Sequence, residues 1–333
     1  MSKRNYALDY IRVVAILMIV MCHYCFFSSL DSGIGRYLAG VGNMIFFMLS
    51  ALLYGNRCNY AKTATMGGSN LQHLDCHHFI CKRIIKLGAS VWPFLVVLTL
   101  LFLIFDIKFS WIDVGLNFAF LGYLGKLPGN GHLWFLTVIM CCYAEYMLFD
   151  RLQIRKKWFP WILLVGSIAV MAALESIGIP GNAFAILGFF GFLLMKADRF
   201  MRTARELNLW MILIIVVINA SLLWLDIEGL FEKSRIIHYL ACDICGCLLL
   251  ALFIRMMPDK ENKFIMFLSG ISFEIYVVHH TLCAGPMVRI PQMTESHILN
   301  FIVLLAVAFV LAIVLHWVAS MLNSFLLKIT RNV

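Results

Sequence analysis

The stretch Ala7-Leu-Asp-Tyr-Ile-Arg-Val-Val-Ala-Ile-Leu-Met-Ile-Val-Met-Cys-His-Tyr-Cys-Phe-Phe27 decides the fold of this chain. About 20 predominantly apolar residues in a row are long enough to cross the hydrocarbon core of a membrane as one helix. Arg12 and His23 interrupt the stretch, and ionisable groups are costly in hydrocarbon, so they mark a candidate functional site; a structural ion pair and a histidine hydrogen-bonded between helices are the alternative. Eleven residues at about 100° each place both side chains on one helix face, roughly 16 Å apart along the axis.

The composition extends this interpretation to the whole chain. Of 333 residues, 62% are hydrophobic and only 14% are charged, whereas soluble domains carry about 45–50% apolar and about 25% charged residues. The chain is therefore predicted to be an all-α, polytopic membrane protein. No cleavable signal is visible, because the first apolar run is too long for a signal segment and no clear cleavage site follows it. The first helix is expected to be retained.

Apolar runs long enough to span a membrane recur along the chain, which predicts about ten transmembrane helices in a single integral membrane domain, residues 1–333. We expect the spans at 7–27, 37–55, 84–105, 132–149, 158–175, 182–197, 208–225, 236–255, 264–284 and 297–322.

The basic residues predict the orientation of these spans. With the N-terminus in the cytosol, twenty of the 27 Lys and Arg residues fall in inner segments and six in outer ones, and Arg12 lies within the first span. The positive-inside rule then predicts that both termini are cytoplasmic, in a multi-pass protein of the cell inner membrane. The formal charge of +9 is dispersed over short loops rather than gathered on one face, so nucleic acid is not an expected partner, whereas membrane lipids are.

The apolar stretch 109–124 would add an eleventh crossing and invert every later loop. That inversion would move the basic clusters at Arg151, Arg199 and Arg255 to the outside. The charge distribution therefore predicts that 109–124 lies in the outer interface or re-enters the membrane without crossing it.

The cysteines and one histidine cluster raise the question of metal binding. Most of the 11 cysteines fall inside apolar runs, where Cys behaves as a small hydrophobe, so we expect them to be reduced and structural. His73, Cys76, His77, His78 and Cys81 recur at three- and four-residue steps in a cytosolic loop, which is compatible with zinc. Their spacing matches no strong motif, and we predict no metal.

Five segments, in order along the chain, resemble signatures of the family 3 membrane acyltransferases of the bacterial O-acetyltransferase type. They are Asn5-Tyr-Ala-Leu-Asp9-Tyr-Ile-Arg12 followed by His23, Phe46-Phe-Met-Leu-Ser50-Ala51, Phe79-Ile-Cys-Lys-Arg83-Ile-Ile-Lys86 with Trp92-Pro93, His132-Leu-Trp-Phe-Leu136, and Ser272-Phe-Glu-Ile-Tyr276-Val-Val-His279. Two positions depart from the family pattern. Ala51 replaces a Gly, and Lys86 replaces an Arg, so a guanidinium that can form two parallel hydrogen bonds is replaced by a single ammonium charge.

The resemblance implies a membrane O-acyltransferase, most often an O-acetyltransferase. Such an enzyme moves an acyl group from a cytosolic acyl-coenzyme A to a hydroxyl of a cell-surface glycan or a lipid-linked sugar. Acetyl-coenzyme A is then a co-substrate, and no permanently bound cofactor is expected.

The first helix supplies the expected catalytic residues. Acyl transfer to an alcohol needs a base, and a neutral imidazole supplies one near pH 7, so His23 is the expected base. Arg12 either binds the donor arm or pairs with Asp9, three residues earlier on the same face. Direct transfer is the expected mechanism, and a covalent acyl intermediate on Ser50 stays open as an alternative.

Other residues are assigned by charge and by the resemblance. Coenzyme A carries a 3′-phosphate and a pyrophosphate, which cationic groups hold; Arg83, Lys86 and Arg57 are the candidates, with Ser50 in the same acyl-donor group. The acceptor or supporting group comprises His132, Trp134, Glu145, His279 and Asp9. Trp134 is either an interfacial anchor or a platform for a sugar ring, and Glu145 is expected to pair, to be protonated or to orient a histidine.

Three alternatives stay open at this point. Ten helices with buried charge also describe a transporter or flippase for a glycan or lipid. An O-succinyltransferase of the same family fits the same motifs. The two departures from the family pattern are compatible with an inactive sensor or scaffold.

Overall fold

The computed structural model describes residues 4–30, 32–65, 76–152 and 157–331, without the side chains of 56–65, 76, 77, 330 and 331. The described residues form helices and no strands, which confirms the predicted all-α class. They divide into two compact units, each built from several separate stretches of chain. Unit 1 comprises residues 1–22, 31–74 and 141–269, and unit 2 comprises 23–30, 75–140 and 270–333.

Nine helices of the described residues are long and apolar enough to cross a membrane. They confirm the predicted polytopic membrane architecture. The expected span 182–197 forms the first part of α7 (Asn182–Arg205), which is not among the nine. The last turns of α7 carry Lys196, Arg199, Arg202 and Arg205, so apolar sequence gives way to a basic end within one helix.

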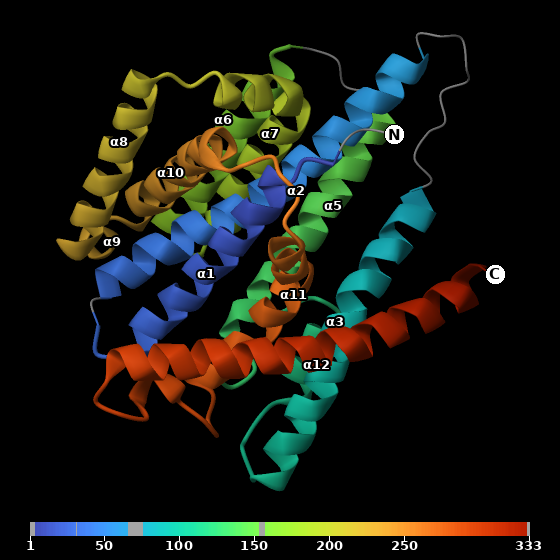
Figure 1. Ribbon diagram of the computed structural model, residues 1–333, viewed down its shortest axis with the longest axis vertical. Coiled ribbons are helices and arrows are strands. Elements are labelled where there is room, and N and C mark those ends of the chain that lie inside the picture. Colours follow the sequence, from blue (N-terminus) through green and yellow to red (C-terminus); the bar gives the residue numbers. More distant parts are fainter. Residues whose placement is uncertain (1–3, 31, 66–75, 153–156, 332–333) are drawn as a thin grey trace. The chain divides into compact units, whose positions relative to one another are not determined.

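Unit 1 is a bundle around α2 (Ser32–Thr65), α7 and α10 (Arg235–Met256), which pack on one another (Figure 1). The helices α6 (Phe159–Ser176) and α8 (Leu209–Ile227) cover this core, and the short α9 (Leu230–Lys233) joins α8 to α10. The unit also takes the first part of α1 (Ala7–Phe27), the second part of α5 (Trp134–Leu152) and the start of α11 (Lys263–Ala284).

Close helix packing in unit 1 depends on small residues, as is typical of membrane bundles. A Cβ atom added at Gly55 of α2 would lie 2.5 Å from the carbonyl oxygen of Leu194 and 2.5 Å from Ala197 Cβ, both on α7. Because a backbone atom cannot move aside, only glycine fits at this crossing.

Unit 2 is organised by α3 (Cys76–Ile104) and α12 (His297–Arg331), which cross and pack on each other (Figure 1). The unit adds the end of α1, the short helix α4 (Trp111–Phe118), the 3₁₀ turns η1 (Gly131–Leu133) and η2 (Ile290–Gln292), and the parts of α5 and α11 that lie outside unit 1. The Nε1–H group of Trp92 on α3 donates to the carbonyl oxygen of Phe118, which anchors the end of α4.

The stretch 109–124 does not cross a membrane by itself. Its only helix, α4, has eight residues, which at 1.5 Å per residue gives about 12 Å, well short of the roughly 30 Å hydrocarbon core. Ser110 caps the helix by accepting from the Asp113 amide. The prediction that 109–124 adds no eleventh crossing is confirmed.

Candidate functional site

Four imidazoles meet in unit 2, and we call them the imidazole cluster: His23, His132, His279 and His280. The end of α1 provides His23, η1 provides His132, and α11 provides the other two. The ring centroid of His23 lies 4.9 Å from that of His279 and 4.4 Å from that of His280. His23 is half-buried and the other three are buried. The structure thus brings together three histidines that the sequence predicted separately.

The hydrogen bonds of His279 determine the tautomer of His23. His279 Nδ1 lies 2.8 Å from the Tyr276 carbonyl oxygen and 3.1 Å from that of Ile275. Carbonyl oxygens only accept, so Nδ1 of His279 carries the hydrogen, and in the neutral ring its Nε2 is an acceptor. This Nε2 lies 3.0 Å from His23 Nδ1, which must therefore donate. The lone pair of His23 is then on Nε2, as a general base requires.

His280, the residue after His279, also belongs to the cluster. Its Nδ1 donates to the carbonyl oxygen of Gly129 at 2.7 Å, and its ring stacks on His132 at 4.6 Å. Gly129 has a φ of +66°, and a Cβ atom there would lie 2.6 Å from Gly285 Cα. Only glycine fits this turn, and the turn holds His280 in place.

We predict that His279 acts as a positioning residue for His23. His279→Phe should lower kcat about 10- to 100-fold with an unchanged KM for the acyl donor, because the ring that fixes the tautomer is lost. In His279→Gln, a side-chain carbonyl oxygen can again accept from His23 Nδ1 and should restore part of the rate. Nitrogen NMR of labelled His23 should show a shift away from the Nδ1–H tautomer in the Phe variant. An unchanged tautomer would rule out this role.

A second polar group, which we call the guanidinium group, lies in unit 1 and comprises Arg4, Asp9, Arg12 and Ser269. Arg12 Nη1 donates to Ser269 Oγ at 2.9 Å, and Ser269 Oγ donates to Asp9 Oδ1 at 2.8 Å. Arg12 Nη1 lies 3.8 Å from the same oxygen of Asp9, and Arg4 Nη2 lies 2.8 Å from its other oxygen. The expected pairing of Asp9 with Arg12 is present, and Ser269 bridges it.

The charges of the guanidinium group do not cancel. Two guanidinium ions share the single carboxylate of Asp9, which leaves one positive charge over. The Arg12 side chain is 28% exposed, while that of Asp9 is 8% exposed. A partly accessible cation fixed by a buried carboxylate suits an anionic or strongly polar ligand.

A comparison with known families matches residues 5–321 of the chain to the family model of an acyltransferase domain, that of the acyltransferase 3 family. The chain belongs to the acyltransferase 3 family. The match covers nearly the whole sequence, including the imidazole cluster and all of the guanidinium group except Arg4, so the protein is a membrane acyltransferase. No curated protein and no solved structure matches the chain.

The expected donor residues of the acyltransferase come from both units, Arg83 and Lys86 from unit 2 and Ser50 and Arg57 from unit 1. Arg83 and Lys86 lie near the start of α3, with Arg83 half-buried and its guanidinium 5.2 Å from the Phe79 ring centroid, and Lys86 exposed. Ser50 donates back to the Phe46 carbonyl oxygen of its own helix at 3.4 Å, and its expected role stays a prediction. Arg57 lies in α2, but its side chain lies outside the described residues.

Trp134 and Glu145 of the acyltransferase both lie on α5. Trp134 begins the helix directly after η1 and is half-buried. Oε2 of Glu145 is buried and has no hydrogen-bond partner among the described residues. The expected roles of Glu145, to pair, to be protonated or to orient a histidine, stay predictions. Of the histidine and cysteine cluster whose spacing is compatible with zinc, His73 lies outside the described residues, as do the side chains of Cys76 and His77.

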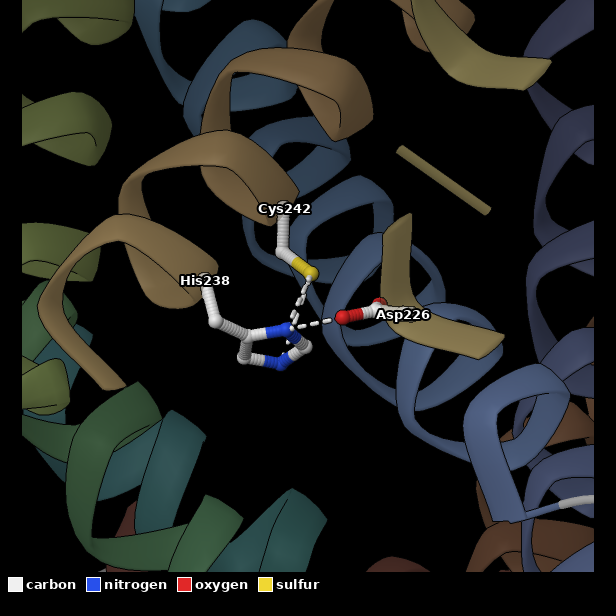
Figure 2. Close-up of side chains that lie close together, drawn as sticks. All are labelled: Asp226, His238 and Cys242. Atoms are coloured by element: carbon white, nitrogen blue, oxygen red, sulfur yellow. Dashed lines mark hydrogen bonds and ion pairs between the residues drawn. The ribbon is translucent and has the colours of Figure 1, made fainter. Parts of the chain in front are cut away.

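One further polar group of the acyltransferase was not predicted. Figure 2 shows Asp226 at the end of α8 facing His238 and Cys242 of α10, all three buried. Asp226 Oδ1 lies 2.7 Å from His238 Nδ1, a hydrogen-bond distance. The sulfur of Cys242 lies 3.7 and 4.0 Å from the two ring nitrogens, so it faces the ring rather than either lone pair. Zinc would need an oxygen and a nitrogen each about 2.0–2.2 Å from the metal and thus farther apart, so we interpret the group as a hydrogen-bonded pair that joins α8 to α10.

Proposed function

We propose that the acyltransferase is an O-acetyltransferase of the cell inner membrane, which moves an acetyl group from cytosolic acetyl-coenzyme A to a hydroxyl of a cell-surface glycan or its lipid-linked precursor. The hydrogen bond between His279 Nε2 and His23 Nδ1 carries this proposal. It leaves the lone pair of His23 on Nε2, where an acceptor hydroxyl can deliver its proton.

The transfer is a direct displacement. His23 Nε2 takes the proton of the acceptor hydroxyl while that oxygen bonds to the acyl carbon. The bond between the acyl carbon and sulfur then breaks, and the coenzyme A thiolate leaves with the bonding electron pair. His23 returns the proton to the thiolate, so the base is regenerated and no covalent enzyme intermediate forms. We also propose that the thioester enters from the cytosolic side past Arg12, which lies on the same helix as His23.

The test uses purified protein in detergent or nanodiscs with radiolabelled acetyl-coenzyme A and a membrane glycolipid. Release of coenzyme A that depends on the acceptor, with label appearing on the glycan, is the expected result. Repeating the assay with succinyl-coenzyme A shows whether the enzyme transfers an acetyl or a succinyl group. Movement of the glycolipid across liposomes without any coenzyme A release would instead identify a flippase and contradict the proposal.

The donor phosphates provide a separate prediction. Arg83→Met should raise KM for acetyl-coenzyme A about tenfold and leave kcat unchanged, because one charge-assisted hydrogen bond to phosphate is lost. Lys82→Met, at an exposed lysine one residue earlier, is the matched control and should change KM little. With acetyl-pantetheine, which lacks the phosphates, Arg83→Met should have no effect. Equal losses on both donors would show that Arg83 does not bind phosphate.

A further inference from the structure

His132 differs from the other members of the imidazole cluster in its hydrogen bonding. His23, His279 and His280 each have a ring nitrogen bonded to another imidazole or to a carbonyl oxygen. His132 is 2% exposed, and neither of its ring nitrogens has a hydrogen-bond partner among the described residues. The main chain of Val277 lies near the ring without completing a hydrogen bond of normal geometry. The acyltransferase thus buries one imidazole whose two ring nitrogens can bind a ligand.

The ring of His132 is nevertheless held in place. It stacks on His280 with an interplanar angle of 12° and packs against the ring of Tyr276 at 5.0 Å. The Tyr276 hydroxyl donates to the main-chain carbonyl oxygen of His132, which fixes η1 at this residue. An imidazole positioned by packing, with its nitrogens unbonded, is preorganised for a ligand.

A neutral imidazole always carries one N–H donor, and a buried donor without an acceptor is unfavourable. Acyl transfer creates a hydrogen-bond acceptor when the hydroxyl oxygen attacks the thioester carbonyl. As the hydroxyl oxygen bonds to the acyl carbon, the electron pair of the carbonyl moves onto its oxygen, and this oxyanion needs a fixed donor.

The spacing within the cluster fits this use. Across a tetrahedral carbon, the nitrogen of the base and the nitrogen that binds the oxyanion stand roughly 5–7 Å apart, given hydrogen bonds of about 2.8 Å at each side. The ring centroids of His23 and His132 are 6.4 Å apart.

We propose that His132 donates its ring N–H to the oxyanion that forms on the thioester carbonyl, while His23 takes the acceptor proton. This inference rests on the proposed function, since it assigns a second catalytic residue to the same transfer. The His132 proton stays on its nitrogen throughout. When the carbonyl re-forms, its electron pair returns from the oxyanion and the bond to sulfur breaks.

The test compares two variants of similar side-chain length. His132→Gln keeps an N–H donor and His132→Met removes it. The Met variant should lose about 10²- to 10³-fold in kcat with an unchanged dissociation constant for acetyl-coenzyme A, because binding precedes oxyanion formation. The Gln variant should retain a larger part of the rate. Equal rates in the two variants would overturn the proposal.

A donor with sulfur in place of the carbonyl oxygen separates a chemical role from a structural one. The dithioester analogue of acetyl-coenzyme A develops negative charge on sulfur, a weak hydrogen-bond acceptor. The wild-type enzyme should therefore prefer the oxygen donor strongly, and His132→Met should bring the ratio of the two rates close to one. A ratio that stays at the wild-type value would show that His132 is only structural.

Two controls keep the result interpretable. His297→Phe replaces another histidine of unit 2, whose Nε2 contacts Ser29 Oγ at 3.1 Å, and it should leave the rate ratio unchanged. If the wild-type protein transfers no acyl group from any coenzyme A thioester, the proposed function fails and this inference fails with it. Normal transfer in His132→Met would overturn the inference alone.

Discussion

His23→Ala should lower the rate of acetyl transfer by about 10³- to 10⁴-fold while leaving the affinity for acetyl-coenzyme A within about twofold of wild type. The imidazole acts on the acceptor proton in the transition state and contributes little to donor binding, so the loss falls on kcat. Initial rates of acceptor-dependent coenzyme A release, with donor binding measured by calorimetry, give the two quantities.

Met21→Ala is a suitable control for this variant, because it shortens a half-buried side chain two residues away on α1 without removing a titratable group. It should keep most of the wild-type rate. Full activity in a folded His23→Ala protein would eliminate His23 as the base, and the covalent alternative on Ser50 would then be tested next by trapping labelled enzyme.

Asp226→Leu should have the largest effect on stability, a loss of about 3–5 kcal/mol, because it leaves His238 buried without its hydrogen-bond partner. Asp226 is 0% exposed and His238 is 3% exposed, so water cannot replace the lost bond. The double variant Asp226→Leu with His238→Leu removes both polar groups and should recover most of the stability. Thermal unfolding in detergent, followed by circular dichroism, measures each variant.

The same measurement distinguishes a hydrogen-bonded pair from a metal site. A chelator should leave the unfolding temperature of the wild-type protein unchanged. A large decrease on chelation, reversed by added zinc, would show that Asp226, His238 and Cys242 bind metal. Failure of the double variant to recover stability would indicate that the two side chains have further partners.

The fold was predictable to the extent that length and hydropathy determine a membrane helix. Residues 7–27 form one helix over the predicted bounds, because a membrane span must satisfy its backbone internally. Hydropathy was less informative at α7, where an apolar first half continues into a basic end in the same helix. Neither the predicted spans nor the charge counts show which helices pack side by side, so the division into two units could not be predicted.

The candidate site was predictable residue by residue but not as an arrangement. His23, His132 and His279 stood out because polar groups are conspicuous in apolar runs and because their motifs resemble a known family. His280 was missed because its position depends on the turn at Gly129. A turn leaves no periodic pattern in the sequence, so its geometry could not be predicted. Ser269 was missed because a serine in an apolar helix gives no signal until the partner on α1 is known.

The partner behind His23 has a consequence for the choice of acyl donor. A serine protease places a carboxylate behind its histidine, and that negative charge stabilises the imidazolium. Here the partner is another uncharged ring, His279, which in turn bonds to carbonyls of its own helix. A positively charged His23 gains no counter-ion from this partner, so it should pass its proton on quickly. A thiolate leaves without prior protonation and then accepts that proton, whereas the poorer alkoxide leaving group of an oxygen ester would need a longer-lived acid.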